Sequence, residues 1–518
     1  MNGADALVAT LHANGIDLVF ANAGTSEMHV VAALDGVPDL RPVLCLFEGV
    51  ATGAADGYAR VSGDVAATLL HLGPGLANGW ANLHNARRAG VPVLNVVGVH
   101  PDAHDRLDPP LSSRVSQLAA SLGGAVTTVH RTADVPAAAA QAITGARHPR
   151  AQVSTLLVPA DVAWSPFGPA PRRWPAVAAH EPVAPAADDV VRAIGWLRTG
   201  RAALVVGGSL SASDLSRAAT VVGATGARLL VETFPTIMDH GASTPSPERI
   251  VYLSDFAVPQ LSGLDRVVLA GAAEPVGFFA YPDLPSRLLG AQCQVLDLCG
   301  NGADPATALA DLAAAAGTGP GPGGATPPPA VPSGPLTPLT FAAAVAATVP
   351  EGAVVVDEAN TGGVHLYDAL AAAAPHRLMT LTGGAIGFGL PAALGAALGS
   401  HGPVIALVAD GALQYTAQAL WSLAREDLDV TVVVVANATY DILRLERARL
   451  GPLPTSGASH LLTDLGAPVI DHVSLARAYG VPARRVESAD ELVAALARRA
   501  VGHTGPELIE VPLAPLAL

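Results

Sequence analysis

The chain contains no lysine: all 29 of its lysine-plus-arginine positions are arginine. A Schiff-base lysine, a lysine that anchors pyridoxal phosphate and the lysine of a phosphate-binding P-loop are therefore excluded. Cysteine is also scarce. Cys45, Cys293 and Cys299 have no metal-binding spacing and form no disulfide framework, so we expect them to be packing residues.

Positive charge is in the minority, and long apolar runs are missing. The formal net charge is −15, whereas nucleic acid and anionic membranes attract proteins with a basic surface, so we expect neither as a partner. Glycine, proline or charge interrupts every apolar run, and the first residues lack the basic region and apolar core of a signal peptide. We therefore expect a cytoplasmic protein without a membrane span.

What the chain does contain is a repeated alternation of short β-branched strands and alanine-rich helices. Its 518 residues exceed what one hydrophobic core holds, and two proline-rich stretches, 165–189 and 317–338, read as linkers. We predict an α/β protein of three doubly wound parallel-sheet domains, at 1–165, 189–317 and 338–518. In such sheets ligands bind at the carboxyl ends of the strands.

Two oxygen-bearing side chains end successive strands of the third segment. Asp410 closes "VIALVAD", and Asn437 closes "VTVVVVAN" 27 residues later. If these strands are neighbours, both side chains can reach one Mg²⁺ ion, and Gly411 and Ala412 open a helix whose amides favour an anion. We predict a site for Mg²⁺ bridging a diphosphate. The alternative is that Asp410 only caps a helix and Asn437 only forms a turn.

These two motifs, "ADG" and "ANATY", resemble those of the thiamine-diphosphate-dependent 2-oxo acid decarboxylase and acetolactate synthase superfamily. The resemblance implies thiamine diphosphate and Mg²⁺ as cofactors, with Asp410, Asn437 and the carbonyl of Thr439 as metal ligands. Ala409 and Ala436 replace a family glycine and asparagine, neither of which is a metal ligand. Further cofactor contacts are implied by "DEANTGG" and "TGGAIGFGLP" and by the helix start, namely Asn360, Gly384, Ile386, Gly411, Ala412, Thr439 and Tyr440.

The stretch "LCLFEGVATGAADGYAR" places one carboxylate, Glu48, between an apolar strand and a small-residue helix. An isolated glutamate there is most simply a solvated residue at a helix start. Together with "FANAGTSE" and "HLGPGLANGW", however, the stretch resembles the pyrimidine-binding domain of the same superfamily, with central and diphosphate-binding domains following. The resemblance implies that Glu48 is catalytic and hydrogen-bonds the aminopyrimidine of the cofactor. It also implies a homodimer, or a homotetramer, whose active sites form between subunits.

The substrate pocket is described by the resemblance alone. His71 and Thr25 match catalytic positions of the benzoylformate decarboxylase branch, although a lone histidine beside glycine is otherwise an ordinary loop residue. Phe278 and Phe279 stand where that branch has a second histidine, and the central domain has no clear flavin fingerprint, so we expect no FAD. The residues expected to face the reacting carbon are Leu111, Ile442, Leu443 and Glu446.

The predicted function is removal of CO₂ from a 2-oxo acid, followed by protonation of the remaining fragment or its ligation to an aldehyde or ketone acceptor. One alternative is acetolactate-synthase-type condensation of two 2-oxo acids. Another is a degenerate cofactor-binding scaffold subunit, which Ala409 and Ala436 would fit. A flavin-dependent oxidase is a further possibility.

Overall fold

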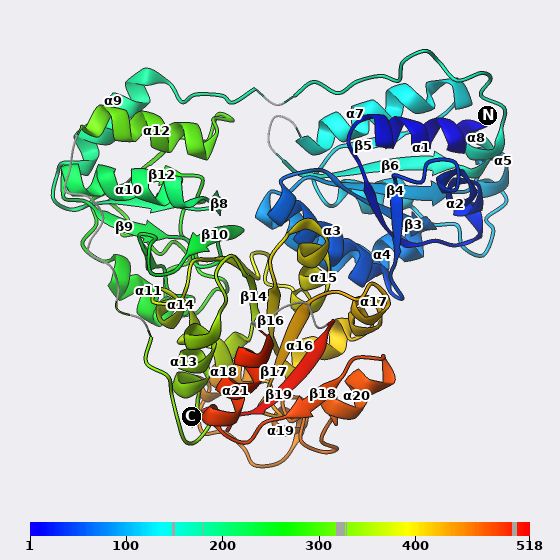
Figure 1. The fold of residues 1–518 in the computed structure, drawn as a ribbon. Helices are drawn as coiled ribbons and strands as arrows, with labels where there is room; N and C mark the ends of the chain where they lie inside the picture. The colour runs from blue at the N-terminus through cyan, green and yellow to red at the C-terminus, as the bar shows by residue number, and fades with distance from the viewer. Residues whose placement is uncertain (148–150, 180, 318–326, 328, 500–504, 518) are drawn as a thin grey trace.

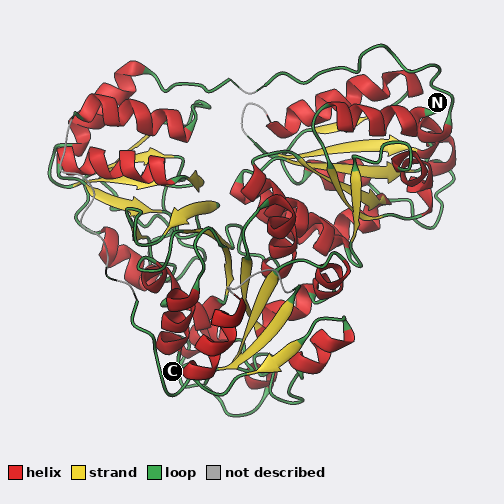
Figure 2. Ribbon diagram, viewed as in Figure 1, coloured by secondary structure: helices red, strands yellow, loops and turns green. Residues whose placement is uncertain are grey.

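The computed structural model describes residues 1–147, 151–179, 181–317, 327, 329–499 and 505–517. Three sheets form separate regions of the molecule, each with helices packed against it (Figures 1 and 2). The central strands of these sheets are almost wholly apolar and buried, as expected for parallel sheets covered on both faces. The predicted α/β class is confirmed. No helix among the described residues is long and apolar enough to cross a membrane.

The first sheet is entirely parallel, in the order β2-β1-β3-β4-β6-β5. Its strands are β1 (Leu18–Asn22), β2 (Arg41–Leu44), β3 (Ala66–His71), β4 (Val93–Val99), β5 (Val126–Thr128) and β6 (Val153–Pro159). Its helices are α1 (Gly3–Ala13), η1 (Thr25–Glu27), α2 (Met28–Leu34), α3 (Glu48–Ser62), α4 (Leu72–Ala89), α5 (Asp102–Asp105), α6 (Val115–Ala120), η2 (Thr132–Asp134), α7 (Val135–Arg147) and α8 (Ala160–Trp164).

The second sheet has the order β11-β9-β7-β12-β13, in which the chain starts in the middle and winds outward in both directions. Its strands are β7 (Ala202–Val206), β9 (Arg228–Val231), β11 (Glu248–Arg249), β12 (Arg266–Ala270) and β13 (Gln294–Asp297). The helices of this region are α9 (Ala187–Leu197), α10 (Ala212–Thr225), α11 (Ser254–Leu261) and α12 (Pro305–Ala316).

The third sheet has the order β18-β19-β17-β16-β14-β15-β10-β8. Its strands are β8 (Ser209–Leu210), β10 (Ile237–His240), β14 (Val354–Glu358), β15 (His376–Thr380), β16 (Val404–Ala409), β17 (Val430–Ala436), β18 (Ala483–Arg485) and β19 (Glu507–Pro512). Its helices are α13 (Pro338–Thr348), η3 (Asn360–Gly363), α14 (Leu366–Leu370), α15 (Gly389–Gly399), α16 (Asp410–Thr416), α17 (Ala419–Arg425), α18 (Asp441–Ala448), α19 (Ala458–Leu461), α20 (His472–Ala478) and α21 (Ala489–Arg499).

The third sheet is not built from the third segment alone, as three self-contained domains would require. β8 and β10 come from the segment assigned to the central domain, and β10 pairs antiparallel with β15. This pairing covers the edge of β15, which would otherwise offer unpaired backbone groups. The domain boundaries themselves stay a prediction. The first proline-rich stretch crosses from the first to the second region along the top of Figure 1, and much of the second stretch, 318–326 and 328, lies outside the described residues.

The first and third regions join through two closely crossing helices, α3 and α15. A Cβ atom added at Gly395 would lie 1.8 Å from the carbonyl oxygen of Ala54, and one at Gly57 would lie 2.1 Å from that of Ala392. Only glycine allows this approach. One continuous apolar core therefore runs from the first sheet, through these helices, to the third sheet.

Candidate active site

Asp410 and Asn437 lie at the carboxyl ends of neighbouring strands, because β16 pairs in parallel with β17. The expected adjacency of the two strands is thus confirmed. Asp410 is buried, and its Oδ1 accepts a hydrogen bond from the Gly411 amide at 2.8 Å, while Oδ2 accepts one from the Ala438 amide at 2.7 Å. Burial raises the pKa of this carboxyl, although the two amides act in the opposite direction.

The side-chain amide of Asn437 has a fixed orientation. Its Nδ2 donates to Asp441 Oδ2 at 2.8 Å, and its Oδ1 accepts from the Thr439 amide at 3.2 Å. Asp441 is buried and also pairs with Arg444 at 2.6 Å. The nitrogen of the Asn437 amide therefore faces Asp441, while its oxygen stays with the 437–439 turn.

The donor set at this edge fits a hard cation such as Mg²⁺, because a carboxylate, an amide oxygen and a main-chain carbonyl are all oxygen ligands. Within the described ranges, no group of three or more His, Cys, Asp or Glu residues is arranged to hold a metal. Asp410 is the one anionic side chain in the predicted set, so it neutralises only one of the two positive charges of Mg²⁺. An anionic ligand such as a diphosphate would neutralise the other.

The next predicted cofactor contacts follow directly on this edge. Tyr440 lies against the start of α16: a Cβ at Gly411 would come 2.4 Å from its ring. Ala412 is buried behind them. After the neighbouring strand β14, Asn360 begins η3 in a left-handed conformation with φ of 50° and is exposed. Asparagine tolerates this conformation better than most residues.

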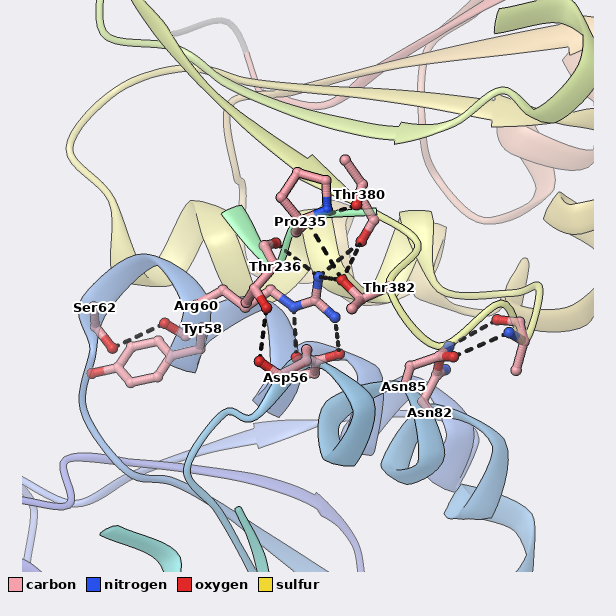
Figure 3. Close-up of polar contacts among 12 residues, drawn as sticks. Asp56, Tyr58, Arg60, Ser62, Asn82, Asn85, Pro235, Thr236, Thr380 and Thr382 are labelled. Atoms are coloured by element: carbon pink, nitrogen blue, oxygen red, sulfur yellow. Dashed lines mark hydrogen bonds and ion pairs between the residues drawn. The ribbon is translucent and has the colours of Figure 1, made fainter. Parts of the chain in front are cut away.

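The glycine-rich loop 383–388 carries the predicted contacts Gly384 and Ile386, the latter half-buried. Gly384 has a φ of 80°, a conformation that other residues rarely adopt. Helix α4 of the first region holds this loop in place (Figure 3). Asn85 donates to the Ala385 carbonyl at 2.8 Å and accepts from its amide at 3.1 Å, and Asn82 donates to the Gly387 carbonyl at 3.1 Å.

Glu358 is a buried acid that the sequence reasoning passed over within "DEANTGG". It accepts hydrogen bonds from the amides of Gly387, Phe388 and Gly389 at 2.7 to 3.1 Å, where α15 begins. Burial raises the pKa of Glu358 to about 7, against the opposing effect of these three donors. The glycine loop is thus fixed from the sheet side by Glu358 as well as by α4.

At the carboxyl edge of the first sheet, His71 and Thr25 follow the neighbouring strands β3 and β1. Thr25 is exposed, and the side chain of His71 is 22% exposed. His71 Nδ1 lies 2.7 Å from Oε2 of Glu27, a fully buried carboxylate that also accepts from the Gly24 amide. Burial raises the pKa of Glu27, while Gly24 and His71 lower it.

Glu27 was also missed. Its signal was present, because it follows Thr25 by two residues in "GTSE", but nothing local to that motif shows that it contacts His71 across 44 residues of chain. The space around the pair is tight: a Cβ at Gly98 would lie 1.9 Å from Glu27 Oε1. Just beyond β4, the rings of His100 and His104 pack edge to face with their centroids 5.2 Å apart.

Glu48 is the first residue of α3 and is half-buried. Its Oε2 accepts a hydrogen bond from Asn78 of α4 at 2.9 Å. A Cβ at Gly75 would lie 3.3 Å from the other oxygen, Oε1, so a glycine keeps that side of the carboxylate open. Glu48, His71 and Thr25 therefore share one edge of the first sheet region.

One cavity beside the predicted metal residues is lined by described residues of the third region. A cavity of about 170 Å³ borders Asp410 and Asn437, and every residue that lines it lies between Asp410 and Leu513. Of the predicted substrate-pocket residues, Leu443 and Leu111 are exposed and Ile442 is half-buried. Glu446 accepts a hydrogen bond from Tyr281 of the central segment at 2.9 Å.

Comparisons with known proteins place both ends of the chain in one family. Residues 1–119 match the family model described as "Thiamine pyrophosphate enzyme, N-terminal TPP binding domain", and residues 361–511 match "Thiamine pyrophosphate enzyme, C-terminal TPP binding domain". A Mycobacterium tuberculosis protein with the name "Putative acetolactate synthase large subunit IlvX" is 50% identical over 517 residues, which cover 99% of each chain.

More distant relatives also span the whole chain. A benzoylformate decarboxylase of Pseudomonas aeruginosa is 28% identical over 534 residues, covering 97% of both chains. The solved structure of a thiamine diphosphate-dependent 4-hydroxybenzoylformate decarboxylase from Rhodococcus jostii superposes with a TM-score of 0.83 at 25% identity, covering 99% of each chain.

Proposed function

The chain belongs to the thiamine pyrophosphate enzyme family, and we propose that it uses thiamine diphosphate with Mg²⁺ to remove CO₂ from a 2-oxo acid. The remaining fragment is then protonated or ligated to an acceptor carbonyl. When bound, this cofactor supplies a carbanion and an electron sink for bonds next to a carbonyl. The carrying observation is that Glu48 and the Asp410–Asn437 pair stand at carboxyl edges of two different sheets.

We assign Glu48 to hold a proton at the aminopyrimidine. Asn78 fixes one of its oxygens, and the small Gly75 leaves the other accessible. Asp410, the Oδ1 of Asn437 and the Thr439 carbonyl would hold Mg²⁺. The opening of α16 at Gly411 and Ala412 would receive the diphosphate, because free amides at a helix start favour anions. His71, positioned by Glu27, would move a proton near the substrate.

We propose that the enzyme is at least a homodimer with active sites between subunits, and that it acts in the cytoplasm. Large apolar side chains are exposed in both regions that carry the proposed site residues, and a monomer would leave them in water. In the first region these include Met28, Leu44, Leu46, Leu107 and Leu111, and in the third they include Leu450, Leu461, Leu462 and Val469.

The first test replaces the proposed catalytic acid. In Glu48→Gln we expect cofactor affinity within about threefold of wild type, because one hydrogen bond is altered, and CO₂ release reduced by at least about a hundredfold. Isothermal titration with thiamine diphosphate and Mg²⁺ measures the first quantity, and a CO₂ assay measures the second. Glu351→Gln, an exposed turn residue, is the control. Wild-type turnover in Glu48→Gln would refute the assignment.

The second test asks whether each site is shared between subunits. Glu48→Gln and Asp410→Ala are each inactive alone under the proposal. When they are co-expressed, half of the dimers pair one variant with the other, and each such dimer has one intact site. We therefore expect about a quarter of wild-type activity. If both residues served the same site from one chain, the mixture would stay inactive.

The second candidate reaction is condensation of two 2-oxo acids, and one comparison favours it. The relative that is 50% identical carries the name of an acetolactate synthase subunit, which points to condensation of two 2-oxo acids. Mass spectrometry of the product decides, because decarboxylation gives an aldehyde and condensation gives a hydroxyketo acid. The scaffold alternative is disfavoured, because Glu48, Asp410 and Asn437 are all retained despite Ala409 and Ala436.

A further inference from the structure

Four aromatic residues of the central segment form a cluster that is partly open to solvent. The ring of Phe278 lies 5.7 Å from that of Phe234, 5.0 Å from that of Tyr252 and 6.1 Å from that of Phe279. Phe278 and Phe279 are nevertheless 43% and 58% exposed. Aromatic surface of this kind is costly in water, so a cluster left open implies something that covers it.

One end of this cluster touches the glycine loop of the third region. A Cβ atom at Gly384 would lie 2.8 Å from Cε1 of Phe278, so the phenyl ring lies against the side of Gly384 from which a side chain would project. Gly384 and Ile386 are predicted cofactor contacts. Phe278 therefore lies beside the place where the cofactor would bind.

The other end of the same segment is anchored to α18. The Tyr281 hydroxyl donates to Glu446 at 2.9 Å, and the Arg449 guanidinium lies 4.6 Å from the centre of the Tyr281 ring. Arg449 also pairs with Glu446 at 3.1 Å and with Asp255 of α11. Burial and the neighbouring Glu446 raise the pKa of Tyr281 to about 12, so the hydroxyl remains a donor.

These contacts determine which side chains of segment 278–281 are accessible to a substrate. The charge of Glu446 is engaged by Tyr281 and Arg449, so it is not free to bind or repel a ligand. Within segment 278–281 the exposed side chains are apolar: Phe278, Phe279 and Ala280. The two phenyl rings, 6.1 Å apart, thus form an aromatic wall, defined here as Phe278 and Phe279.

We propose that the preferred acyl donor is a 2-oxo acid with an aromatic or similarly bulky apolar substituent, which packs against the aromatic wall. This inference rests on the proposed function. A methyl group, as in pyruvate, would leave most of the wall uncovered. A phenyl ring buries far more apolar area, which favours it over methyl by at least about tenfold.

The experiment compares donors and a matched pair of variants. With holoenzyme loaded with thiamine diphosphate and Mg²⁺, CO₂ release is measured for pyruvate, 4-methyl-2-oxopentanoate, phenylpyruvate and phenylglyoxylate. We expect kcat/KM for the best aromatic donor to exceed that for pyruvate at least tenfold, and Phe278→Ala to lower this ratio about tenfold. Phe256→Ala, 62% exposed on α11 of the same region, should not change the ratio.

A binding measurement tests the aromatic wall without requiring that the enzyme turn over. Calorimetry with the unreactive probes phenylacetate and acetate should give a preference for phenylacetate that Phe278→Ala weakens about tenfold and Phe256→Ala does not. A preference for pyruvate, or an unchanged ratio in Phe278→Ala, would overturn the inference while leaving the proposed function intact. A Phe278→Ala protein that loses its oligomeric state in gel filtration would likewise overturn it, because the wall would then be subunit interface. No CO₂ from any donor, with Glu48→Gln indistinguishable from wild type, would instead remove the proposed function.

Discussion

Individual buried acids carry much of the local organisation around the candidate site. Glu358 fixes the glycine loop from one side, and Glu27 holds the His71 ring. Both are buried, and burial raises both pKa values. A carboxylate inside a protein costs free energy unless donors surround it, so residues of this kind are retained where their contacts matter. The contacts of neither residue can be recognised from its neighbours in the sequence.

Glu358 gives a prediction for the pH dependence of stability. Its folded-state pKa of about 7 lies above the ordinary 4.5. The folded protein therefore holds a proton that the unfolded chain has released between these values, so this contribution is complete below about pH 4.5 and lost as pH rises through about 7. From pH 5 to 8 we expect the free energy of unfolding of wild type to fall by on the order of 2 kcal/mol relative to Glu358→Gln.

Denaturation at pH 5, 6, 7 and 8 checks this difference, with Glu351→Gln as the exposed control. A gap between wild type and Glu358→Gln that stays constant with pH would mean that the three amides keep Glu358 ionised throughout. In that case hydrogen bonding, and not burial, determines the pKa of Glu358 in the folded protein.

At the scale of elements, the crossing of α3 and α15 joins the first and third sheets and connects the helix that begins at Glu48 with the helix that follows the glycine loop. Glu48 starts α3, and the glycine loop leads into α15. The position of Glu48 relative to the glycine loop therefore depends on how closely these two helices approach each other. Glycines at Gly57 and Gly395 set that distance.

We expect Gly395→Ala to lower the free energy of unfolding by about 1–3 kcal/mol, because its Cβ would overlap the Ala54 carbonyl oxygen and force the helices apart. Gly195→Ala is the matched control. Gly195 lies within α9 with open space around its Cβ position, and alanine there should be neutral or stabilising by about 0.5–1 kcal/mol. Chemical denaturation compares the two. Equal effects would mean that the crossing tolerates an extra methyl group.

At the scale of the whole molecule, one buried ion pair contacts residues from all three sequence segments (Figure 3). Arg60 pairs bidentately with Asp56 of its own helix at 2.8 Å and donates to the carbonyls of Thr236 and Thr380, at 3.0 and 2.8 Å. Both side chains of the pair are fully buried, and the guanidinium also lies over the Phe388 ring. Arg60 thus contacts the first, second and third parts of the chain at once.

Removing Arg60 should weaken the packing of α3 against the chain around Thr236 and Thr380. We expect Arg60→Met to cost about 3–5 kcal/mol, because Asp56 is left buried without its counter-ion. The double variant Asp56→Asn with Arg60→Met should regain part of this loss, because no unpaired charge remains. Denaturation and limited proteolysis of the linkers measure both variants. A double variant no more stable than Arg60→Met alone would show that the lost hydrogen bonds, and not the unpaired charge, set the cost.

Much of this protein is determined by short-range features of its sequence. Apolar β-branched runs separated by helices predict covered parallel sheets, and the strand ends at Asp410 and Asn437 predict a shared edge, because both depend on local periodicity and on one crossover. The family and its cofactor followed from motifs of the same local kind.

The tertiary structure decided whatever depends on residues distant in the chain. Glu27 contacts His71, and α4 hydrogen-bonds to the glycine loop. β10 pairs with β15 in the third sheet, and Phe278 contacts Gly384. Each contact joins residues that are tens to hundreds of positions apart in the chain. No periodicity encodes these contacts, because they arise only when separately formed elements pack together. Sequence therefore specified the elements and their chemistry, and packing specified which side chains act together.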